Sequence, residues 1–234
     1  MSLLELERVV KTVGRGPGQR AILREISLRV DPGELVAIWG SRRSGRSTLL
    51  RIAAGFTRPD EGVVRFQGED LAGKGGDAHR AGIAYCLTRN GSRESLVVLE
   101  QLITDQVARG VGIEVAEKQA LGALARTGGE QCAAARFNAL DPAEAVRVAL
   151  ARALTQQPRL ILADEPTLGV ELAVRDEVLR LLRSLADEGI AVLMTTGDTP
   201  CLSVADRKLS LDAGELHGNL TPKVARVVRL RRSA

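Results

Sequence analysis

The sequence predicts an α/β protein with a largely parallel sheet, and three observations lead to that prediction. Short apolar runs at 35–39, 160–163 and 191–195 have the composition of strands that are buried on both faces. Stretches with helical periodicity follow these runs, among them 47–54 and 170–188. Strands that alternate with helices form parallel sheets, because each helix carries the chain back to the same edge.

The other segments fit the same architecture. From 96 to 154 the chain has helical periodicity, and Asp141-Pro142 opens a helix there. Further strands are expected at 3–9, 22–30, 62–66, 83–87 and 208–211. We therefore expect a single domain over 1–234, with a core at about 1–90 and 155–234 and an inserted helical subdomain at about 91–154.

Composition narrows the classes of function. With 44% hydrophobic and 26% charged residues, the chain can bury a core and keep a solvated surface. A net charge of +4 and 2% aromatic residues give little material for binding nucleic acid, and no nucleic-acid partner is expected. No signal peptide or membrane span is evident, so work at a membrane would need a partner. Cys86, Cys132 and Cys201 lie far apart and suit structural thiols in a reducing cytosol.

A Gly-rich loop between the strand at 35–39 and the following helix predicts a phosphate site. Glycines let backbone N–H groups surround phosphate oxygens, and the helix N-terminus adds the positive end of its dipole. The pattern requires Lys at position 46 and this chain has Arg, a wider planar group that is not equivalent. The candidate nucleotide-binding residues are Gly40, Ser41, Arg42, Arg43, Ser44, Gly45, Arg46, Ser47 and Thr48.

Two adjacent carboxylates, Asp164 and Glu165, end the apolar run at 160–163. In P-loop enzymes an Asp at a strand end holds Mg²⁺, and Ser47 would add a hydroxyl ligand. The next carboxylate can orient or deprotonate the attacking water. We therefore expect Ser47 and Asp164 to bind Mg²⁺ and Glu165 to be the catalytic residue if the chain is active.

With these motifs the chain resembles ABC-transporter ATPase subunits, most closely the compact subunits of lipoprotein-release and macrolide-export systems. The likeness runs from Leu3 to about Leu216 and is strongest at 33–38, 40–48, 147–154 and 160–167. It implies a P-loop NTPase-type core with a mainly parallel sheet, a small antiparallel β part and a helical subdomain. It also implies a head-to-tail dimer around two ATP molecules, docked on a permease.

Several family motifs are altered in this chain. Val13 stands where the family has an aromatic residue that stacks on adenine. Thr88 stands where the family has a glutamine, at the junction with the helical subdomain. Gly197, just before Asp198, replaces the switch histidine of the family. Glu171 replaces the aspartate of the loop after Thr167.

The signature motif, Leu-Ser-Gly-Gly-Glu in the family, reads Leu-Asp-Pro-Ala-Glu over 140–144. Asp141 brings a carboxylate where a triphosphate would bind, Pro142 removes an N–H, and Ala143 adds a Cβ. The same residues favour a helix start whose N–H groups are hydrogen-bonded within the helix itself. Asp141 is expected as the N-cap, Pro142 at the first helical position, and Glu144 completing a capping box.

These changes together predict very low or absent ATP hydrolysis, with weak or absent binding of ATP and Mg²⁺. The favoured function is a degenerate nucleotide-binding subunit, a scaffold or regulatory half of a dimer on a membrane permease. Its partners would be the permease and a second, intact ATPase subunit, with the chain peripheral at the cytoplasmic face of the membrane.

Three alternatives stay open at this point. The first is an active ATPase with a variant P-loop that drives export or lipoprotein release, favoured a little by Glu165. The second is a soluble ABC protein that acts on nucleic acid or ribosomes. The third is a purely structural or regulatory binding module.

Overall fold

A computed structural model describes residues 2–14, 18–71, 82–86 and 96–218 of the chain. Its larger sheet has six strands in the order β10-β9-β3-β8-β7-β6, and all neighbours are parallel except β10 and β9. The strands are β3 Leu35–Trp39, β6 Ile83–Cys86, β7 Leu160–Asp164, β8 Ala191–Thr196, β9 Arg207–Asp212 and β10 Glu215–His217. The predicted parallel sheet is therefore confirmed.

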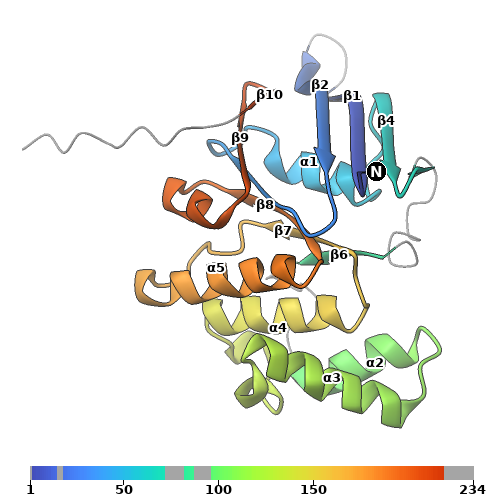
Figure 1. The fold of residues 1–234 in the computed structure, drawn as a ribbon, viewed down its shortest axis with the longest axis vertical. Coiled ribbons are helices and arrows are strands. Elements are labelled where there is room, and N and C mark those ends of the chain that lie inside the picture. The colour runs from blue at the N-terminus through green and yellow to red at the C-terminus, as the bar shows by residue number, and fades with distance from the viewer. Residues whose placement is uncertain (1, 15–17, 72–81, 87–95, 219–234) are drawn as a thin grey trace, which may run out of the picture.

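A smaller antiparallel sheet with the strand order β2-β1-β4-β5 forms a second layer. Its strands are β1 Leu4–Val13, β2 Arg20–Val30, β4 Glu61–Phe66 and β5 Glu69–Asp70. The buried side chains of β2 alternate at Ile26, Leu28 and Val30, as in a strand with one buried face. Figure 1 shows this sheet beside α1, at the end of the molecule that also holds the described N-terminus.

The helices cover both faces of the parallel sheet. Helix α1 packs between the two sheets, whereas α4 and α5 lie on the opposite face with α2 and α3 beyond them (Figure 1). The helices are α1 Arg46–Ala53, α2 Val98–Val107, α3 Ile113–Thr127, α4 Pro142–Leu154 and α5 Leu172–Asp187. Short 3₁₀ turns occur at η3 Glu130–Cys132, η4 Phe137–Ala139 and η5 Thr199–Val204.

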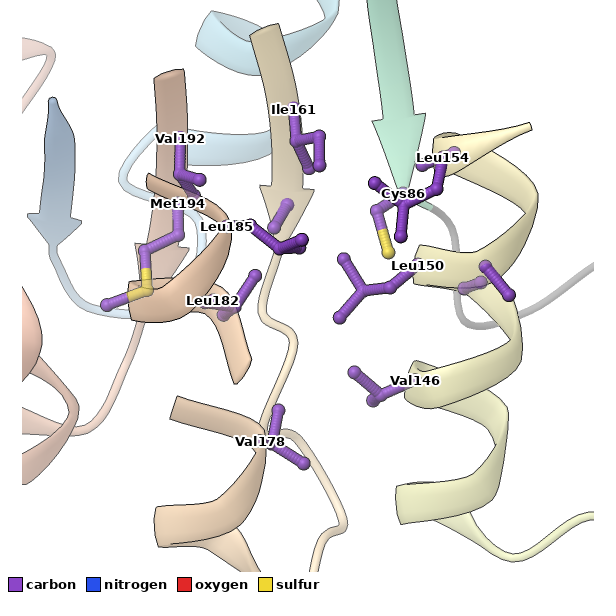
Figure 2. Close-up of a cluster of buried hydrophobic side chains, with 14 of the residues drawn as sticks. Cys86, Val146, Leu150, Leu154, Ile161, Val178, Leu182, Leu185, Val192 and Met194 are labelled. Atoms are coloured by element: carbon purple, nitrogen blue, oxygen red, sulfur yellow. The ribbon is translucent and has the colours of Figure 1, made fainter. Parts of the chain in front are cut away.

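The alternation of side chains along β3 divides the interior into two cores. Val36 and Ile38 face α1 and the antiparallel sheet, whereas Leu35 and Ala37 face the helical side. On the helical side, α5 presents buried residues at helical spacing, Leu182 and Leu185 among them. Figure 2 shows these leucines against β7 and β8, with α4 closing the cluster. The same packing fixes the carboxyl ends of β3, β7 and β8, where the predicted site lies.

The structure also tests the expectations for the cysteines and for a membrane span. Cys86, Cys132 and Cys201 are all buried and none forms a disulfide bond. Within the described ranges, no helix combines the length and the apolar character that crossing a membrane requires.

Candidate functional site

The Gly-rich loop turns between β3 and α1, as the sequence predicts. Gly45 has φ +105°, and a Cβ there would lie 2.9 Å from Ile22 Cγ2, so only glycine fits. At Gly40 an added Cβ would lie 2.6 Å from Leu211 O and from Ser44 Oγ. Both glycines let the loop approach its neighbours closely.

That space is a cavity of about 910 Å³ over the loop and the start of α1. The loop residues 42–48 line it together with Asp164 and Glu165. Gly40 and Ser41 line an adjoining cavity of about 440 Å³, which shares Arg42, Arg46 and Glu165 with the first. The structure therefore brings all nine predicted nucleotide-binding residues and both carboxylates to one place.

The loop suits a phosphate group. Among the described residues no side-chain capping bond is made at the N-terminus of α1, and residues 45–48 at this helix start line the cavity, so its first N–H groups are available to an anion. The buried hydroxyl of Ser44 has no hydrogen-bond partner in the described part of the chain either. Ser47 and Asp164 line the same cavity, and hydroxyl and carboxylate oxygens are ligands that Mg²⁺ accepts. Their role as magnesium ligands stays a prediction.

Thr195 on β8 organises the two carboxylates at the end of β7. Its Oγ1 donates a hydrogen bond to Asp164 Oδ1 at 2.7 Å and accepts one from the N–H of Glu165 at 3.1 Å. Glu165 has φ +49°, a left-handed conformation that is strained for a residue with a side chain. The Thr195 bond supports this conformation directly.

Tyr85 on β6 holds the other oxygen of Asp164. Its hydroxyl donates to Asp164 Oδ2 at 3.3 Å, and its ring lies 5.5 Å from that of Phe56. Burial, and then the charge of Asp164, raise the pKa of the Tyr85 phenol, so it remains a donor at neutral pH. The Asp164 carboxylate is thus held in one orientation from both sides.

Arg46 reaches across the cavity to Glu165. Its Nη2 donates to Glu165 Oε1 and forms an ion pair, with the Arg46 side chain 6% exposed and that of Glu165 27% exposed. Arg46 Nη1 is also buried and has no partner among the described residues. The residue that replaces the expected Lys therefore contacts the residue expected to act on water.

Gly197 stands beside this ion pair. Its N–H donates to Glu165 Oε2 at 3.3 Å, and its carbonyl accepts a hydrogen bond from Trp39 Nε1 at 3.2 Å. The next residue, Asp198, forms an ion pair with Arg175 of α5. The segment after β8 is thus fixed on both sides although it lacks the expected histidine.

The predicted capping box at the start of α4 is confirmed. Glu144 N–H donates to Asp141 Oδ1 at 2.8 Å, and Asp141 N–H donates to Glu144 Oε2 at 3.0 Å. Pro142 occupies the first turn, as expected. These contacts use the Asp141 carboxylate and two N–H groups within the helix itself.

The remaining sites that differ from the family motifs are separate from this cluster. Val13 is 41% exposed and pairs with Arg20, which lines the larger cavity. Glu171 is the N-cap of α5, with no side-chain capping bond among the described residues. Thr88 lies outside the described residues.

Sequence reasoning missed Trp39, Tyr85 and Thr195 as parts of the site. Each lies in or at the end of an apolar strand and looks like an ordinary core residue in the sequence. The available signal was position, because side chains at the carboxyl ends of adjacent parallel strands meet at a ligand-binding edge.

Comparisons with known proteins agree with this geometry. Residues 23–168 match the ABC transporter family. The lipoprotein-releasing system ATP-binding protein LolD of Ruegeria sp. (strain TM1040) is 36% identical over 219 residues, 91% of this chain and 96% of the relative. The macrolide export ATP-binding/permease protein MacB of Bartonella henselae is 32% identical over 229 residues, 96% of this chain but 35% of that protein.

A solved structure has the same fold. It is a dimeric, post-hydrolysis state of the ATP-binding cassette MJ0796 bound to ADP and Pi. It matches with a TM-score of 0.82 and 26% identity, covering 92% of this chain and 98% of that one. Fold, phosphate loop and paired carboxylates thus agree with the sequence match. The chain belongs to the ABC transporter family, as a nucleotide-binding subunit.

Proposed function

We propose that this chain is a catalytically degenerate nucleotide-binding subunit, the scaffold or regulatory half of a dimer on a membrane permease. The observation that carries the proposal is the ion pair between Arg46 and Glu165. A carboxylate that orients or deprotonates water has to direct a lone pair at it, and here Arg46 pairs with one oxygen of Glu165 while Gly197 N–H donates to the other. Both oxygens are thus directed at protein groups, and the Arg46 cation competes with water for the carboxylate.

A bound Mg²⁺–ATP would supply the reacting phosphate and its counter-ion in this family. This chain would hold the phosphates with the loop and α1, and would keep Glu165 on Arg46. We expect weak nucleotide binding, because Arg46 is shared with Glu165 and Val13 offers no ring for adenine. Hydrolysis should also be slow, because the loss of one donor that stabilises the charge of the transition state commonly lowers the catalytic rate by about 10²–10³.

The start of α4 supports a second, independent defect. In a head-to-tail dimer this segment would face the nucleotide of the other subunit. Here Glu144 N–H donates to the Asp141 carboxylate, Asp141 N–H donates to the Glu144 carboxylate, and Pro142 has no N–H. A homodimer would combine two poor loops with two poor signatures, so we propose a different, intact ATPase subunit as the partner.

The relatives support the permease as the second partner. The MacB relative carries its permease in the same chain, whereas the LolD relative has nearly the length of this chain. We propose that this chain, a single domain with its helical part at about 91–154, docks on a permease at the cytoplasmic face of the membrane.

One observation favours the alternative of an active ATPase with a variant loop. Asp164 and Glu165 are both retained, and Thr195 and Tyr85 hold Asp164 in an ordered position. If ATP binding drew Arg46 onto the phosphates, Glu165 would become free to act on water.

Turnover separates the two functions. The purified chain is assayed for phosphate release with Mg²⁺–ATP beside a Glu165→Gln control. We expect the two rates to be equal, and a Mg²⁺-dependent rate that disappears in the control would establish the active alternative. Co-purification from cells tests the partnership: an assembly with two copies of this chain and no other ATPase subunit would contradict the heterodimer.

A further inference from the structure

The Arg46 guanidinium lies beside the space that a side chain at residue 197 would occupy. A Cβ built on Gly197 would lie 3.5 Å from Arg46 Nη1, 3.7 Å from Arg46 Nη2 and 3.7 Å from Glu165 Oε2. These are ordinary contact distances, so a methyl group fits. Any larger side chain would begin in contact with both members of the ion pair.

Backbone conformation does not explain the glycine. Gly197 is absent from the glycines of this chain with positive φ, so its backbone is open to residues with side chains. Its N–H and carbonyl are held by Glu165 and Trp39, as they could be in any residue. The property of glycine that matters here is that it places no side chain beside the buried Arg46 guanidinium.

We infer that Arg46 and Gly197 are a coupled pair, in which Arg46 is the positioning residue of Glu165 and Gly197 leaves the space it occupies. Arg46 holds Glu165 Oε1 while Gly197 N–H holds Oε2, so the carboxylate is clamped between the phosphate loop and the segment after β8. The two altered motifs are then one change, and restoring either alone would leave the site worse or unimproved.

The inference rests on the proposed function and names the contact that keeps Glu165 from water. It has a consequence for anion binding. The negative charge of Glu165 offsets that of Arg46, one of the arginines that line the cavity over the phosphate loop, and so weakens the attraction of Arg46 for a phosphate. Arg46 Nη1 is buried without a partner among the described residues, and an anion in the adjoining cavity would satisfy it.

The first test measures thermal unfolding of the ligand-free full chain in four forms: unaltered, Gly197→His, Arg46→Lys, and both together. Gly197→Ala is the matched control, because its Cβ fits. We expect Gly197→His to lower the melting temperature strongly when Arg46 is present and much less in the Arg46→Lys background, with Gly197→Ala close to the unaltered chain. An equal loss in both backgrounds, or no loss in either, overturns the inference.

The second test measures binding of a non-hydrolysable ATP analogue with Mg²⁺ by calorimetry, a readout that packing alone would not move. Glu165→Ala should tighten binding roughly tenfold, because a charge-assisted partner of Arg46 is removed. The same substitution beside Arg46→Gln should have a much smaller effect. If Glu165→Ala acts equally with and without the guanidinium, Arg46 does not hold Glu165. No turnover occurs with this probe, so the result is independent of whether the chain hydrolyses ATP.

Discussion

Asp141 and Glu144 cap each other at the start of α4: the side chain of each accepts a hydrogen bond from the backbone N–H of the other. Members of the family present this helix start to a nucleotide on the opposite subunit. Here both contacts are made within the segment itself, and they stabilise the start of the helix.

Replacing Asp141 with alanine should destabilise the protein. The substitution leaves the N–H of Glu144 without its acceptor, and loss of an N-cap costs about 1 kcal/mol of unfolding free energy. Urea denaturation at neutral pH measures the difference. Asp141→Ser keeps an acceptor and should be nearly neutral, so equal losses for the two variants would contradict a capping role.

Restoring the signature should raise the ATPase rate of the assembled pair. Asp141→Ser, Pro142→Gly and Ala143→Gly together return an N–H and close backbone approach, and they remove the carboxylate. We expect a gain of at least tenfold, since one such donor is commonly worth about 10²–10³ in rate. Pro142→Gly alone keeps the Asp141 carboxylate and should raise the ATPase rate only slightly. A triple variant no faster than this single one would place the defect elsewhere.

An aromatic residue at position 13 should improve recognition of adenine. Val13 is 41% exposed and pairs with Arg20 at the edge of the larger cavity. Stacking on an aromatic ring contributes about 1–3 kcal/mol per base, so Val13→Tyr should tighten ATP binding at least severalfold. Calorimetry against Val13→Leu separates stacking from apolar area. Equal gains in the two variants would show that no ring contact forms.

Thr195→Val should destabilise the protein more than Tyr85→Phe. The threonine change removes a donor to Asp164 and an acceptor for Glu165 N–H, and an unsatisfied buried polar group costs about 1–3 kcal/mol. The tyrosine change removes one longer bond of 3.3 Å. Chemical denaturation ranks the two. If Tyr85→Phe were the more harmful, Tyr85 rather than Thr195 would order the carboxylates.

The contribution of Asp60 to stability should depend on pH. Hydrogen bonds from the Lys11 ammonium and then from Thr12 lower the pKa of Asp60 from 3.8 to about 2. A lowered folded-state pKa stabilises the protein above the unfolded-state value, and the effect fades as pH falls towards 2. Asp60→Asn should therefore lower the melting temperature at pH 7 but not near pH 2, and Lys11→Met should show the same window. A pH-independent effect would exclude the ion pair as its cause.

The sequence alone determined the parts of this protein that depend on near neighbours. The apolar runs of β3, β7 and β8 predict buried strands, because side-chain burial sets their composition. The glycines at 40 and 45 predict the phosphate loop, and Asp141-Pro142 with Glu144 predicts the capping box, since these contacts join residues a few positions apart. Spacing along the chain is sufficient for such features.

Only the tertiary structure decided which residues the altered loop contacts. Arg46 and Glu165 are 119 positions apart, and Gly197 lies a further 32 along the chain. Their meeting depends on the parallel order of β3, β8 and β7, which places the carboxyl ends of these strands side by side. In the sequence, Arg46 and Gly197 read as two separate losses. In the fold the two positions are neighbours, since a Cβ at residue 197 would lie 3.5 Å from Arg46 Nη1 and any longer side chain would compete with the guanidinium for the same space.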